Sequence, residues 1–153
     1  MSLKAGDLVP EFTSVTETGR QTTLTELLAD GPVVVFFYPA AFTSGCTAEA
    51  CHFRDLAAEF TAVGASVVGV SRDAVDKQSK FSEAHGFGFP LLSDRNRTVA
   101  RAFGVQRLGF LPNARATFVV DTDRKILSAT ASEINMNKHA DRALDTLRQR
   151  AAA

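Results

Sequence analysis

The chain has 153 residues, of which 45% are hydrophobic and 22% charged, and its 17 basic side chains balance its 17 acidic ones. This length is enough for a proper core, and we expect one domain covering residues 1–153. The balanced charge gives no indication of nucleic acid or a membrane surface as a partner, and no long uncharged apolar run is present. The N-terminus lacks the apolar core of a signal peptide, so we expect a cytoplasmic, reducing location.

Taken in chain order, the hydrophobic patterns predict strands that alternate with helices. Strands are predicted at residues 11–15, 21–24, 33–38, 65–71, 89–92, 116–120 and 125–129. Helices are predicted at residues 25–28, from 43 or 44 to a stop at Gly64, from a cap at Asp73 to about His85, at 96–103 and at about 137–150. Residues 105–114 are expected to be irregular. This alternation, with a late hairpin, predicts an α/β domain built on a mixed sheet.

Both cysteines of the chain lie in the stretch from Pro39 to Cys51, directly after the apolar run 33–38. Apolar residues then recur at steps of three and four from Cys46 onward, which predicts a helix. Thr43 or Ser44 can cap this helix with its hydroxyl. Cys46 is therefore expected in the first helical turn, where unpaired N–H groups and the positive end of the helix dipole favour a thiolate.

The spacing of the two cysteines has a second consequence. Residues five apart in a regular helix have Cα atoms roughly 8–9 Å apart, beyond the roughly 7 Å limit for a disulfide. Cys46 and Cys51 can therefore join only if the first turns of their helix unwind. The sequence thus predicts that disulfide formation would require a conformational change.

The stretch resembles the active-site signature of the peroxiredoxins, Pro-x-x-x-Thr-x-x-Cys, met here by Pro39, Thr43 and Cys46. The Glu49 and Cys51 that follow are similar to those of the bacterioferritin-comigratory, or PrxQ, subfamily. The run 115–121 resembles the strand that carries the family's arginine, here Arg115. The resemblance covers nearly the full chain and implies a thioredoxin-like three-layer fold, with a central mixed sheet flanked by helices.

These residue types suit attack on a peroxide. Cys46 supplies the nucleophile, and Thr43 has a hydroxyl that can accept a proton from the peroxide and donate one to the sulfur. Pro39 has no N–H and can shield the thiolate, while Arg115 is permanently charged and can donate to sulfur and peroxide oxygen together. The resemblance implies that Glu49 orients Arg115.

The resemblance implies a thiol-dependent peroxidase that reduces hydrogen peroxide and organic hydroperoxides, with a role as an antioxidant in cell redox homeostasis. Cys46 would become a sulfenic acid, and Cys51 would resolve it as an intramolecular disulfide. Thioredoxin or a similar dithiol protein would then reduce the disulfide. The sequence indicates no cofactor and no metal, and the subfamily suggests a monomer or weak homodimer.

Alternative functions remain open. A one-cysteine peroxidase would use an external thiol and leave Cys51 idle. A dithiol–disulfide oxidoreductase is disfavoured by the absence of a Cys-x-x-Cys motif. A non-catalytic thioredoxin-fold binding module would carry Cys46 as an inert buried thiol.

Individual residues also have simpler interpretations. Pro39 could only end a strand, Thr43 only cap a helix, Arg115 lie in solvent and Glu49 serve as a first-turn acid. The three histidines are expected to have no chemical role: His52 at the surface, His85 and His139 without partners. A last group, formed by Phe110 and Leu111, could bind an alkyl hydroperoxide or form a dimer contact if exposed.

Overall fold

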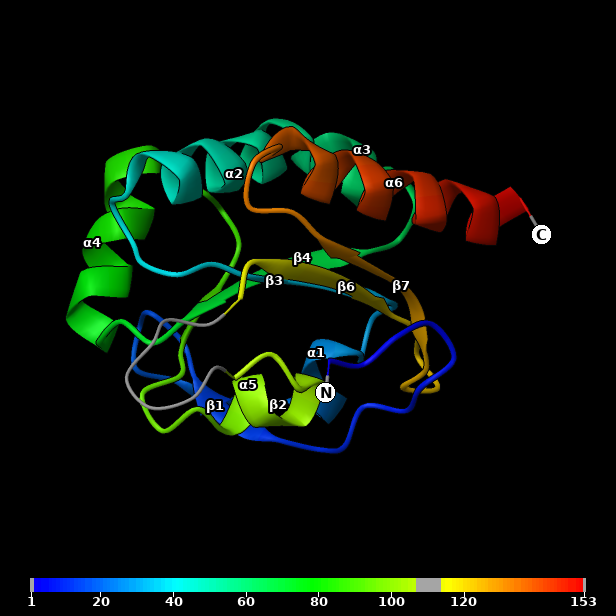
Figure 1. Cartoon of the computed structure of the whole chain (residues 1–153), viewed down its shortest axis with the longest axis horizontal. Coiled ribbons are helices and arrows are strands. Elements are labelled where there is room, and N and C mark those ends of the chain that lie inside the picture. Colours follow the sequence, from blue (N-terminus) through cyan, green and yellow to red (C-terminus); the bar gives the residue numbers. More distant parts are fainter. Residues whose placement is uncertain (1, 107–113, 153) are drawn as a thin grey trace.

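The computed structural model describes residues 2–106 and 114–152, and its centre is a five-stranded sheet (Figure 1). The strand order is β5-β4-β3-β6-β7, with β3–β4 and β4–β5 parallel and β3–β6 and β6–β7 antiparallel. The sheet strands are β3 (Val33–Phe37), β4 (Ser66–Ser71), β5 (Leu91–Ser93), β6 (Ala116–Val120) and β7 (Ile126–Ala131). A separate hairpin pairs β1 (Thr13–Val15) with β2 (Gln21–Thr23). The predicted α/β class with a mixed sheet is confirmed.

Six helices cover the two faces of this sheet in the described residues. They are α1 (Leu24–Leu27), α2 (Ser44–Asp55), α3 (Ala57–Ala62), α4 (Val75–His85), α5 (Thr98–Phe103) and α6 (Asn137–Ala152). Figure 1 shows α2, α3 and α6 above the sheet, with α1, α5 and the β1–β2 hairpin below it. None of these helices is long and apolar enough to cross a bilayer.

The alternation of side chains along β3 divides the core into two layers. Val33, Val35 and Phe37 pack with α1, α5 and the chain before β1, whereas Val34 and Phe36 pack against α2, α3 and α6. Successive residues of a strand point to opposite faces, so a strand covered on both sides is apolar throughout. All five residues of β3 are buried, which accounts for the uninterrupted hydrophobic run in the sequence.

Sheet topology brings three chain segments to one edge. β3 ends at Phe37, and its antiparallel partner β6 begins opposite, where Phe37 pairs with Ala116. β7 ends at the same edge, where Ala131 pairs with Ala116. The residues after β3, before β6 and after β7 therefore converge in space. The segment after β3 lies about 80 residues or more from the other two in the sequence.

Two predicted details differ from the structure. The helix expected to continue to Gly64 is interrupted at Leu56, which separates α2 from α3 without a proline or glycine in the sequence. The expected cap at Asp73 is wrong: Ala74 is the N-cap of α4, and no side chain caps that end. The Asp73 carboxylate accepts instead from the Ala41 N–H at 2.7 Å and from the Ser71 hydroxyl at 2.7 Å. It therefore ties the β4–α4 loop to the loop before α2.

The prediction of one domain over residues 1–153 stays a prediction. Phe110 and Leu111 lie outside the described residues, so the prediction made for them stays open as well.

Gly69, in β4, has no room for a side chain. A Cβ at this position would lie 2.8 Å from Leu91 Cδ2, 2.9 Å from Phe36 Cζ and 3.1 Å from Tyr38 Cε1. All three side chains are fully buried. Gly69→Ala should therefore lower the free energy of unfolding by about 1–3 kcal/mol through overpacking.

Urea denaturation measures this change, with the exposed Ser66→Ala on the same strand as the matched control. The control should leave the midpoint nearly unchanged. A Gly69→Ala variant as stable as the wild type would show that the sheet has slack at this point.

Candidate active site

Cys46 lies in the first turn of α2, immediately beyond the carboxyl end of the central strand β3. Its side chain is buried, with 1% of the residue exposed, and it packs in the apolar layer beneath α2. The open N–H groups of the first helical turn favour a negative sulfur at this place. The predicted position of Cys46 is confirmed.

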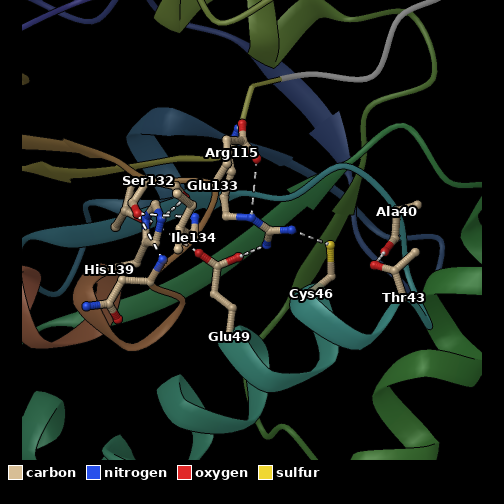
Figure 2. Close-up of polar contacts among 11 residues, drawn as sticks. Ala40, Thr43, Cys46, Glu49, Arg115, Ser132, Glu133, Ile134 and His139 are labelled. Carbon is tan, nitrogen blue, oxygen red and sulfur yellow. Dashed lines mark hydrogen bonds and ion pairs between the residues drawn. The ribbon is translucent and has the colours of Figure 1, made fainter.

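A buried arginine contacts the sulfur directly. Arg115 precedes β6 and reaches across the edge of the sheet, so that its Nη2 donates to Cys46 Sγ at 3.3 Å (Figure 2). Its Nη1 donates to Glu49 Oε1 at 2.8 Å, from the next turn of α2. Arg115 is 7% exposed and Glu49 is fully buried. The pairing of Glu49 with Arg115 expected from the sequence is present.

Glu133, in the segment after β7, is a second carboxylate in contact with Arg115. Its Oε1 accepts from the Arg115 backbone N–H at 3.1 Å, and its Oε2 lies 3.7 Å from Arg115 Nε. The Glu133 side chain is half exposed. The guanidinium is thus fixed between one buried and one half-exposed carboxylate, with its remaining edge directed at the sulfur.

Burial and the neighbouring charges shift the pKa values of Glu49 and Arg115 in opposite directions. Burial raises the pKa of Glu49 to about 8, although the neighbouring Arg115 pulls it down. Burial alone would lower the pKa of Arg115, but the charges of Glu49 and Cys46 raise it above its ordinary value. The guanidinium therefore stays charged, and the carboxyl group is the member of the pair that can take up a proton.

Thr43 and Pro39 occupy the loop between β3 and α2. Thr43 is the N-cap residue of α2, but its side chain makes no cap hydrogen bond, so the predicted side-chain cap is wrong. Its hydroxyl donates to the Ala40 carbonyl at 2.8 Å, so the expected donation to the sulfur is not made, and the oxygen lone pairs are free to accept. Thr43 and Ala40 lie on the other side of Cys46 from Arg115 in Figure 2. Pro39 is partly buried in the same loop.

Cys51 lies on the same helix as Cys46 and is partly buried; both thiols are free. The regular helical path between the two cysteines agrees with the predicted separation, which excludes a disulfide while α2 is intact. No group of three or more His, Cys, Asp or Glu side chains in the described residues is arranged to hold a metal ion.

His139 was missed as a site residue. The prediction that it has no partners is wrong, because its ring contacts Thr117, Ser132 and Glu49 while remaining fully buried. A signal was present in the sequence, since His139 falls four residues before Ala143 on the apolar stripe of α6. His52 pairs with Asp141 at 2.7 Å on the outer side of the α2–α6 interface.

Known proteins share this arrangement. The family model described as AhpC/TSA family matches residues 5–129. A putative peroxiredoxin of Mycobacterium tuberculosis is 58% identical over 149 residues, covering 95% of this chain and 97% of the relative. The crystal structure of peroxidoxin BcpB from M. tuberculosis superposes with a TM-score of 0.93 at 56% identity, covering 96% of this chain and 97% of that one.

A third match is the Xanthomonas campestris bacterioferritin comigratory protein, solved as a trapped intermediate or ligand complex in work on its alkyl peroxide reduction activity. It has a TM-score of 0.84 at 34% identity and covers 92% of each chain. The chain therefore has a thioredoxin-like fold and the function of a thiol peroxidase. The chain belongs to the AhpC/TSA family, as a peroxiredoxin of the Bcp/PrxQ subfamily.

Arg115→Lys tests the contact between the guanidinium and the sulfur. A lysine is a single point donor and cannot reproduce the two directed N–H contacts to Cys46 and Glu49. Loss of one preorganised donor should slow the oxidation of the reduced protein by hydrogen peroxide about 10²–10³-fold.

Stopped-flow measurement of the second-order rate constant checks this effect. Arg150→Lys is the matched control, because Arg150 forms an exposed pair with Asp121 far along the chain from the site. A normal rate in Arg115→Lys would exclude a directed role for the guanidinium.

Proposed function

We propose that Cys46 is the peroxidatic cysteine and attacks the terminal oxygen of hydrogen peroxide or of an organic hydroperoxide. The observation that carries this assignment is the 3.3 Å contact of its sulfur with a buried arginine at a helix N-terminus. In the attack a sulfur–oxygen bond forms and the O–O bond breaks, leaving a sulfenic acid and an alkoxide or hydroxide that takes up a proton. The similarity to a protein studied for alkyl peroxide reduction supports organic hydroperoxides as substrates.

Neighbouring residues are assigned roles in this step. Arg115 stabilises the thiolate and the charge that develops on the peroxide oxygens, because its donors are already aimed at that point. Thr43 accepts a hydrogen bond from the hydroxyl group of the bound peroxide, since its own proton is directed at Ala40. Pro39 shields the sulfur from water. Glu49 orients Arg115.

We further assign Cys51 as the resolving thiol. The sulfenic acid of Cys46 condenses with the Cys51 thiol to form a disulfide and release water. This step requires α2 to unwind over its first turns, because the helical spacing holds the two sulfurs too far apart. A disulfide formed at the expense of helical structure is readily reduced, which suits thioredoxin or a similar dithiol protein as the electron donor.

The same chemistry bears on the compartment, the oligomeric state and the partners of the protein. A thiol peroxidase that depends on a dithiol donor works in a reducing compartment, so we assign the protein to the cytoplasm, as a monomer or weak homodimer. It needs neither a cofactor nor a metal, and it acts without nucleic acid or membrane partners.

Rapid-mixing oxidation of the reduced wild type, Cys46→Ser and Cys51→Ser tests the two assignments. Hydrogen peroxide and cumene hydroperoxide are the oxidants, and the mass of each product is recorded. Fast oxidation should disappear in Cys46→Ser only. The wild type should end as an intramolecular disulfide, and Cys51→Ser as a sulfenic or sulfinic acid.

Turnover with thioredoxin separates the proposal from its nearest rival. If Cys51→Ser turns over at the wild-type rate, an external thiol resolves Cys46 and the internal disulfide is not required. If the wild type reacts with peroxide no faster than free cysteine, the assignment of Cys46 is wrong.

A further inference from the structure

His139 is a fully buried histidine whose protonation is dictated by its neighbours. Its Nε2 lies 2.9 Å from the Ser132 carbonyl oxygen, which can only accept, so Nε2 carries a hydrogen. Its Nδ1 lies 2.8 Å from the Thr117 hydroxyl. In a neutral ring Nδ1 therefore carries a lone pair, which accepts from the Thr117 hydroxyl.

Glu49 presents an unpaired oxygen to this lone pair. Its Oε1 is taken by Arg115, but its Oε2 is buried, has no hydrogen-bond partner and lies 3.5 Å from His139 Nδ1. With both groups deprotonated, two lone pairs face each other in a site without water access, which is costly. A proton on Oε2 removes this repulsion and gives Oε2 a donor directed at Nδ1, whose single lone pair is then shared with the Thr117 hydroxyl.

The charges around Arg115 also favour a protonated Glu49. An ionised Glu49 and a Cys46 thiolate would place two negative charges on one guanidinium, with the half-exposed Glu133 nearby. If Glu49 is neutral, the thiolate is the only buried negative charge on Arg115 among the described residues, and the half-exposed Glu133 is the other carboxylate nearby. A protonated Glu49 thus strengthens the pairing between Arg115 and the Cys46 thiolate.

We propose that Glu49 and His139 share one proton while Cys46 is a thiolate, and that His139 is the positioning residue that keeps Glu49 neutral through Nδ1. The proposal rests on the assignment of Cys46 as the peroxidatic cysteine and adds a proton-holding pair behind it. His139 touches neither the sulfur nor the peroxide and acts through Glu49 and Arg115.

The surroundings agree on which partner carries the proton. Burial raises the pKa of Glu49 to about 8, and burial together with Arg115 lowers the pKa of His139, so the proton lies on the carboxyl oxygen. The groups facing the pair are Cys46 on α2, Arg115 and the neutral Thr117 at the start of β6, Glu133 after β7 and Lys138 on α6.

The peroxide reaction then moves this proton. Attack by the thiolate forms the S–O bond and breaks the O–O bond, and the departing alkoxide takes up one proton. The sulfur is no longer negative in the sulfenic acid, so Glu49 ionises, pairs with Arg115 and releases its proton. In the net reaction the thiolate, the hydroperoxide and the Glu49 proton give a sulfenic acid, an alcohol or water, and a Glu49 carboxylate, so that protons and charge balance.

Infrared spectroscopy of the reduced wild type at neutral pH tests the proton directly, without any variant that must fold. A protonated-carboxyl band that moves on ¹³C labelling of glutamate and is missing in Glu49→Gln is expected. The band should also be lost in Cys46→Ser, which has no thiolate. A reduced wild type without such a band overturns the proposal.

The pH dependence of the peroxide reaction gives the second test. His139→Gln keeps a donor for Ser132 but removes Nδ1, so Glu49 ionises and thiolate formation moves to higher pH. The rate at neutral pH should then fall about tenfold for every pH unit by which the midpoint rises. Glu49→Gln mimics the protonated carboxyl, accepting from Arg115 and donating to His139, and should move the midpoint to lower pH. His52→Gln, which breaks the outer contact between α2 and α6, is the control and should not move it.

Opposite movements of the midpoint in the two variants support the proposal, because damage to packing would not produce both. Equal slowing at every pH, with an unmoved midpoint, assigns His139 a structural role and overturns it. In that case a fast wild-type reaction lost in Cys46→Ser still upholds the peroxidase assignment.

Discussion

The site depends on one buried guanidinium. Arg115 is held by Glu49 on α2 and by Glu133 after β7, and the geometry of those contacts directs its free edge at Cys46 Sγ. A charge buried in this way is stable only while its partners are in place. The same contacts therefore fix the position of Arg115 and allow it to favour a negative sulfur next to the apolar core of α2. Because the arginine is already positioned, little reorganisation is needed when charge develops on a bound peroxide.

Sheet topology supplies the partners of that guanidinium. β6 runs antiparallel to β3 and β7 antiparallel to β6, so the start of β6 and the end of β7 meet the end of β3 at one edge. His139 reaches the same edge from α6 and closes the cluster behind Glu49. The reactive cysteine is carried by a helix whose first turns also separate it from Cys51. In the proposed mechanism, peroxide attack by Cys46 needs α2 folded, whereas disulfide formation with Cys51 needs its first turns unwound.

The sequence predicted most of the fold and the front of the site. Buried strands such as 33–38 and 116–120 are continuous apolar runs that leave little ambiguity, and Cys46 was placed correctly because strand, turn and helix signals adjoin it. The side chains that hold Arg115 and Glu49 from the side away from the sulfur could not be derived in this way. His139 and Glu133 are brought to Arg115 only by tertiary pairing of β6, β7 and α6, which local patterns do not encode. Capping also failed where tertiary contacts prevailed, since Asp73 bonds Ala41 rather than the end of α4.

In the proposed mechanism the site accelerates peroxide attack itself, beyond supplying a thiolate. The most direct measurement compares two reactions of Cys46 at one pH, with hydrogen peroxide and with iodoacetamide, each relative to free cysteine. Directed groups at the sulfur should speed the peroxide reaction by orders of magnitude more than the alkylation, because iodoacetamide presents no O–O bond for Arg115 to polarise and no hydroxyl group for Thr43 to accept from. Equal acceleration of both reactions would mean that thiolate character alone accounts for the reactivity of Cys46, and it would contradict the role given to Arg115.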